Sequence, residues 1–139
     1  MRWSVLLFLM ASGCASTVDP EVSKQREQVA LERVTLANRA FLSCVFQNAE
    51  KWVDSDEPVS VVTDLAIARC SSERANLQVF LHSYNRVYWD PNDSGGALLK
   101  MASDATRSGI DQFTSAAKNA SSEFLMELRI KKASERREN

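Results

Sequence analysis

The chain has 139 residues, of which 45% are hydrophobic and 25% are charged, and its formal net charge is -1 at pH 7. A chain of this length and composition can bury a core and is expected to form one domain, not a disordered tether. A nearly neutral charge offers no basic surface to neutralise phosphates, so nucleic acid is disfavoured as a partner.

The N-terminus is a short apolar segment that leads to a cysteine. Residues 1–10 carry one positive charge followed by an apolar run, and the small residues Ala11, Ser12 and Gly13 come directly before Cys14. The apolar run is far shorter than the ~20 residues that a membrane-spanning helix needs. The segment is therefore predicted to be a processing signal and not a transmembrane anchor.

This arrangement resembles the signal peptide of bacterial lipoproteins, although Ala11 stands where that family prefers leucine. The resemblance implies that residues 1–13 are removed and that Cys14 becomes the first residue of the mature chain, carrying lipid with acyl chains such as palmitate. Ala15 replaces the aspartate that retains enterobacterial lipoproteins in the inner membrane, which favours the periplasmic face of the outer membrane. An ordinary secretory peptide, or a cytosolic protein with an apolar start, is the alternative.

The remaining chain divides by composition into a tether, a domain and a tail. Residues 14–22 are mostly small and polar, as is typical of a tether, and residues 23–128 are expected to form a helical domain. Residues 129–139 hold five basic and two acidic side chains with no apolar stripe beyond Ile130, so this basic tail is expected to fray. Contact with anionic lipid is its alternative role.

Apolar residues recur every three or four positions in three segments, which is the pattern of one buried helix face. The stripes are Ala30, Val34, Ala37, Phe41, Cys44 and Trp52 in residues 23–53; Val62, Ala66, Cys70, Leu77, Phe80, Tyr84 and Val87, interrupted by Glu73, in residues 58–89; and Leu98, Ala102, Ala105, Gly109, Phe113, Ala116, Ala120, Phe124 and Leu128 in the third. Asp90 to Gly96 contains a proline and paired glycines that end the second segment. The sequence thus predicts an all-α fold, a three-helix up-down-up bundle.

The two cysteines of the domain lie at equal distances in sequence from Glu57. Folding the first two helices back on each other there brings Cys44 level with Cys70. In an oxidising compartment such a pair is expected to form a disulfide, with buried free thiols as the alternative. The prediction is a disulfide-clasped N-terminal helical hairpin. No metal site is predicted, because no other ligand accompanies the two sulfurs at a suitable spacing.

Two further residues are candidates for a catalytic role. His82, the only histidine, is expected at the surface, because no acid, cysteine or serine accompanies it in a catalytic spacing. Glu73 is expected either to pair with an arginine (Arg39, Arg69 or Arg74) or to lie at the edge of the helix seam. The sequence contains no phosphate-binding glycine loop and no nucleophile elbow, so we expect no enzyme, no cofactor and no small-molecule substrate.

Protein binding remains the favoured class of function. The first hypothesis is a membrane-tethered interaction module that binds an unidentified envelope protein, and the alternative is an immunity or inhibitor lipoprotein that neutralises a toxin or a lytic enzyme. Tyr88 and Trp89, beside the polar loop, are the predicted partner surface. Their alternative role is to cap the core against Leu98 and Leu99. The membrane, reached through the lipid on Cys14, is the second expected partner.

Overall fold

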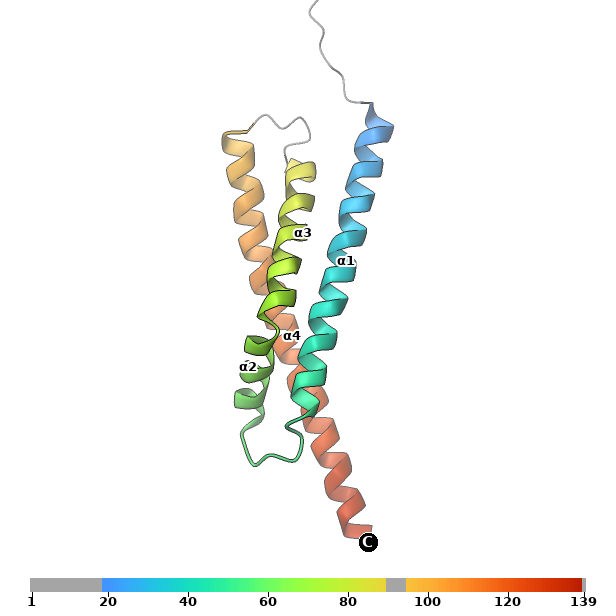
Figure 1. Cartoon of the computed structure of the whole chain (residues 1–139), viewed down its shortest axis with the longest axis vertical. Coiled ribbons are helices and arrows are strands. Elements are labelled where there is room, and N and C mark those ends of the chain that lie inside the picture. Colours follow the sequence, from blue (N-terminus) through green and yellow to red (C-terminus); the bar gives the residue numbers. More distant parts are fainter. Residues whose placement is uncertain (1–18, 90–94, 139) are drawn as a thin grey trace, which may run out of the picture.

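A computed structural model of the chain describes residues 19–89 and 95–138, which form four α-helices and no strand. The helices are α1 (Pro20–Glu50), α2 (Val59–Arg69), α3 (Ser71–Trp89) and α4 (Ala97–Glu138). Figure 1 shows α1 running down the bundle, α2 and α3 returning one after the other, and α4 running back past both. The predicted all-α class is confirmed, with four helices in the described residues in place of three.

The helix predicted over residues 58–89 is divided at Cys70. This residue has φ -97° and ψ 30°, and its N–H donates to the carbonyl of Ile67 at 3.1 Å. A bond that reaches back only three residues tightens the last turn and ends the α-helical ladder. The prediction of one continuous helix is wrong. It used proline and glycine as the signals that end a helix, and neither residue lies at this point.

The core runs along the contact between α1 and α3, with α2 and α4 completing it. On α1 the buried side chains include Val34, Ala37 and Phe41, which belong to the predicted stripe, and Phe41 is fully buried. Leu77 of α3 is also fully buried. Each such large side chain contributes roughly 1.5–3 kcal/mol through removal of apolar surface from water.

The buried face of α4 differs from the prediction. Its buried residues are Ala102, Thr106, Ile110, Ala117, Ser121 and Leu125, so that most of the predicted stripe lies at the margin of the core. Thr106 and Ser121 can be buried because their hydroxyls donate to backbone carbonyls of the same helix, at 2.7 Å and 3.2 Å. An apolar pattern could not assign these two polar residues to the core.

α4 is one helix through Gly109, which lies against α3. A Cβ atom at this position would be 2.7 Å from Cδ2 of Leu81, well inside van der Waals contact. A larger residue would therefore force the side chain of Leu81 to move, so glycine favours the close approach of α3 and α4, although it costs about 1 kcal/mol of helix propensity relative to alanine.

Residues 129–138, expected to fray, continue α4 as helix. Arg129 explains why, because its guanidinium donates to carbonyls of the connection between α1 and α2. Nη1 reaches the oxygen of Glu57 at 2.9 Å, Nη2 that of Ser55 at 3.0 Å, and Nε that of Val53 at 3.2 Å. These carbonyls belong to an irregular segment and need donors from elsewhere.

Two more basic residues of the same helix reach this connection. Lys132 Nζ lies 2.6 Å from one carboxylate oxygen of Asp54, and Arg136 Nη2 lies 3.1 Å from the other. The hydrogen bond from Lys132, with the charge of Arg136, lowers the pKa of Asp54. These basic residues thus contact the α1–α2 connection, whereas the sequence predicted that they would fray into solvent.

Candidate functional site

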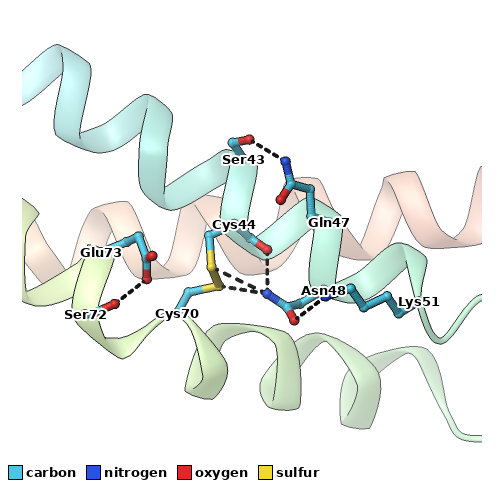
Figure 2. The surroundings of a disulfide bond; sticks show 8 residues. All are labelled: Ser43, Cys44, Gln47, Asn48, Lys51, Cys70, Ser72 and Glu73. Carbon is cyan, nitrogen blue, oxygen red and sulfur yellow. Dashed lines mark hydrogen bonds between the residues drawn. A yellow bond between two sulfur atoms is a disulfide. The ribbon is translucent and has the colours of Figure 1, made fainter.

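The Cys44–Cys70 disulfide joins α1 to the junction between α2 and α3 (Figure 2). The two Cα atoms are 5.9 Å apart, and the sequence separation is 26 residues. This confirms the predicted pairing of the two cysteines. The bond closes a loop that contains the α1–α2 connection and all of α2.

Polar groups surround the disulfide, as Figure 2 shows. Asn48 Nδ2 donates to the carbonyl of Cys44 at 3.0 Å and lies 3.5 Å from each sulfur. Glu73 is half-buried and accepts a hydrogen bond from Ser72 Oγ at 2.8 Å. Within the described residues it has no arginine partner, so the alternative of a place at the edge of the seam fits it better.

The sulfurs of Cys44 and Cys70 and a carboxylate oxygen of Glu73 all lie within 4.8 Å of one another. This grouping was not predicted from the sequence, although Glu73 lies one turn after Cys70. A cysteine binds a metal ion as a thiolate, and both sulfurs are already bonded to each other. The group is therefore a structural crosslink and not a metal site.

The C-terminal turns of α3 carry an aromatic cluster of Tyr84, Tyr88 and Trp89. The rings of Tyr84 and Tyr88 stack with centroids 6.1 Å apart, and Trp89 meets Tyr88 edge-on at 5.3 Å. Tyr88 is 55% exposed and Trp89 is 37% exposed. The two predicted partner-surface residues thus lie together at the surface, and Leu98 and Leu99, which the core-capping alternative requires, are exposed as well.

Tyr84 connects this cluster to α1. Burial raises the pKa of its phenol, and the nearby carboxylate of Glu27 and the phenol of Tyr88 raise it further. The phenol therefore stays neutral at physiological pH. The cluster thus grades from a half-buried ring at Tyr84, next to α1, to exposed rings at Tyr88 and Trp89.

His82 belongs to a polar network that joins α3 to α4. Asn85 Nδ2 donates to Thr106 Oγ1 at 3.1 Å, and His82 Nδ1 lies 3.5 Å from the same oxygen. The expectation of a surface histidine is wrong, since His82 is half-buried. No carboxylate in the described part of the chain bonds to its ring, so the network has the character of a helix contact and not of a proton relay.

A groove of about 450 Å³ lies between α1 and α3. Its lining residues are Val22, Gln25, Arg26, Val29, Ala30 and Arg33 from α1 and Phe80, Ser83 and Val87 from α3. The groove was not predicted from the sequence, because only Ala30, Phe80 and Val87 of its lining belong to the predicted stripes. Val22 and Val29, seven residues apart on α1, are the signal that could have revealed it, because they place apolar side chains outside the stripe.

The groove is lined by the N-terminal half of α1 and the C-terminal half of α3, and the aromatic cluster lies in the last turns of α3. Figure 1 shows that α1 begins and α3 ends toward the same end of the bundle. The candidate functional site is this end, which we call the open end: the N-terminal half of α1 with the C-terminal half of α3. Cys14 lies outside the described residues. No helix in residues 19–89 and 95–138 has an apolar stretch long enough to cross a bilayer. Comparisons with protein-family models, with curated proteins and with solved structures gave no match.

Proposed function

We propose that the chain is a lipid-anchored protein of the bacterial cell envelope that acts by binding another envelope protein. The observation that carries this proposal is the exposure of Tyr88 and Trp89, side by side at the open end. Tyrosine and tryptophan are the residues most enriched among side chains that dominate binding energy, because they bury a large area with few rotatable bonds. The exposed parts of the two rings can enter a partner's pocket.

The anchor in this proposal is the lipid on Cys14, at the periplasmic face of the outer membrane. An extended chain from Cys14 to Asp19 spans at most ~18 Å at ~3.6 Å per residue. Since α1 begins at the open end, the aromatic cluster would be held near the bilayer surface. Confinement to one layer raises the effective concentration toward a partner in the same membrane, so a modest interface suffices.

The proposal is binding without turnover. The group around the disulfide and the His82 network support this, because each holds helices together. The sulfurs near Glu73 form a crosslink, and His82 shares the hydroxyl of Thr106 with Asn85. The hydroxyl of Thr106, which lies beside His82, is buried and donates its hydrogen to the carbonyl of Ala102, so it does not give its proton to His82 as an activated nucleophile would.

The test is cross-linking in intact cells, followed by extraction of the protein from membranes and recovery of its partner. The intact mass of the extracted protein without cross-linking also reports acyl groups on Cys14. Tyr88→Ala combined with Trp89→Ala should abolish partner recovery while leaving the melting temperature within a few degrees. Leu36→Ala is the control, because Leu36 is 63% exposed and belongs to α1, outside the aromatic cluster. It should retain the partner.

Two outcomes would change the proposal. A large fall in melting temperature for the aromatic double variant would show that the rings belong to the core, and the wild type recovering no partner would remove the proposal altogether. Recovery of a single toxin or lytic enzyme, inhibited at one-to-one stoichiometry, would favour the immunity or inhibitor alternative.

A further inference from the structure

We propose that the groove between α1 and α3 binds a single-chain fatty acid, with the acyl chain along its apolar floor and the carboxylate at Arg26 and Arg33. This site goes beyond the protein-binding function, and neither Tyr88 nor Trp89 lines it. The sequence alone predicted no small-molecule ligand, because the two walls of the groove come from helices far apart in the chain.

The floor of the groove is apolar. Ala30 of α1 and Phe80 and Val87 of α3 are half-buried along it, and Val22 and Val29 form its α1 edge with 41% and 43% of their surfaces exposed. Apolar side chains that line a hollow in this way remain in contact with water in the free protein. An acyl chain bound in the groove would remove its own surface and the apolar floor from water, which is the main favourable term in binding such a ligand.

The rim of the groove is positively charged. Arg26 and Arg33 are seven residues apart on one side of α1, about 10 Å along the helix axis. Neither guanidinium has a carboxylate partner among the described residues, and no acidic side chain lines the groove. A guanidinium fork matches the two oxygens of a carboxylate. The positive charge of Arg26 and Arg33 therefore favours a ligand with an anionic head group beside an apolar chain.

The size of the groove distinguishes the fatty acid from bulkier occupants. Its volume of about 450 Å³ lies toward the lower end of the ~300–1,000 Å³ typical of small-molecule sites. A partner helix is ~10–12 Å across with its side chains, so only one ridge of it could enter. A second copy of this chain docking through the same groove would bring Arg26 and Arg33 against their own like charges.

The position of the groove supplies a source for the ligand. Val22 and Arg26 lie in the first two turns of α1, just after the segment that begins at Cys14. If the proposed lipid anchors Cys14, the mouth of the groove is close to a bilayer that contains acyl chains. This source rests on the proposed anchor, whereas the apolar floor and the two arginines do not.

The experiment titrates dodecanoate, below the concentration at which it forms micelles, into the chain from residue 14 onward with Cys14→Ser. This protein retains every described residue. One molecule should bind per chain, and Arg26→Gln with Arg33→Gln should weaken binding roughly tenfold, equivalent to about 1.4 kcal/mol. Arg39→Gln with Arg107→Gln removes the same charge outside the groove and should change the affinity less than twofold.

A second variant tests the apolar floor. Ser83 is exposed at the groove edge, so Ser83→Trp should fold normally and abolish dodecanoate binding by filling the hollow. Tyr88→Ala with Trp89→Ala should leave dodecanoate binding unchanged, which separates this site from the proposed partner surface. Absence of saturable binding, equal binding of neutral dodecyl maltoside, or full binding by Ser83→Trp would overturn the proposal. Displacement by a much tighter acidic helical peptide would overturn it in favour of a protein ligand.

Discussion

The two ends of the bundle are built in opposite ways. At the closed end, which we define as the α1–α2 connection with the α4 residues that contact it, Arg129 bonds to several carbonyls and Asp54 pairs with two cations. The disulfide joins the C-terminal part of α1 to the α2–α3 junction and closes the loop that contains this connection. At the open end, exposed aromatic rings and the edge of an apolar groove face solvent.

This contrast separates stability from binding. Long-range crosslinks and charged hydrogen bonds order the closed end. The open end keeps apolar and aromatic surface exposed, which a folded chain tolerates only if the rest of the molecule supplies enough stability. Substitutions at the closed end should therefore lower the free energy of unfolding, and substitutions at the open end should lower affinity.

The largest expected effect comes from removing the disulfide. Reduction, or Cys44→Ser with Cys70→Ser, should lower the melting temperature by well over 10 °C. The physical reason is that a bridge across 26 residues limits the unfolded chain and contributes roughly 3–4 kcal/mol. In a domain near 100 residues each kcal/mol corresponds to about 4–8 °C. Circular dichroism at 222 nm during heating, with and without reductant, measures it.

The matched change at the open end is Tyr88→Ala with Trp89→Ala, which should lower the melting temperature by only a few degrees. If this variant were destabilised as much as the reduced protein, the separation of stability from binding would be wrong.

The sulfurs of the reduced protein should also become reactive toward thiol reagents, which they cannot be while bonded to each other.

The second prediction concerns Arg129. Arg129→Met keeps much of the apolar stem and removes the donors to the connecting segment, so we expect a loss of about 2–3 kcal/mol in the free energy of unfolding. Arg136→Met is the control: its side chain is 75% exposed, and we expect a change within ~0.5 kcal/mol. Denaturant titration of both variants provides the comparison, and equal losses would show that Arg129 is only another surface charge.

Sequence periodicity and symmetry identified the first half of the bundle well. Val34, Ala37 and Phe41 are buried as the stripe predicts, and Cys44 is bonded to Cys70 as the symmetry about Glu57 predicts. Both features follow from local rules, because helical spacing and hairpin register involve residues close in the chain. The connection between the two helices is short enough to fix which residues are level.

What the sequence could not supply depends on distant or polar contacts. Arg129 bonds to residues more than 70 positions away, and no periodic pattern encodes such a contact. Thr106 and Ser121 occupy core positions because backbone carbonyls satisfy their hydroxyls, which a pattern of apolar residues cannot show. The aromatic half of the candidate site could be predicted from composition at the end of α3. The groove could not, because it exists only once α1 and α3 are packed together.

The smallest expected effect is a different pH dependence at each end. The pKa of Asp54, at the closed end, is lowered from 3.8 chiefly by its hydrogen bond with Lys132, so its contribution to stability is present above pH ~4 and is lost as the pH falls through the lowered value. The pKa of Tyr84, at the open end, is raised from 10.0 chiefly by burial, so its contribution is present below pH 10 and is lost as the pH rises through the raised value.

Acid should therefore weaken the closed end and alkali the open end. In melting temperatures measured across the pH range, Asp54→Asn should flatten only the acid limb, and Tyr84→Phe only the alkaline limb. Both shifts should be small, because Asp54 is an exposed partner in its ion pairs and only one residue changes at each end. An effect of Asp54→Asn on the alkaline limb would contradict this separation. It would mean that the two ends are coupled through the helices that join them, so that high pH destabilises the whole bundle and not the open end alone.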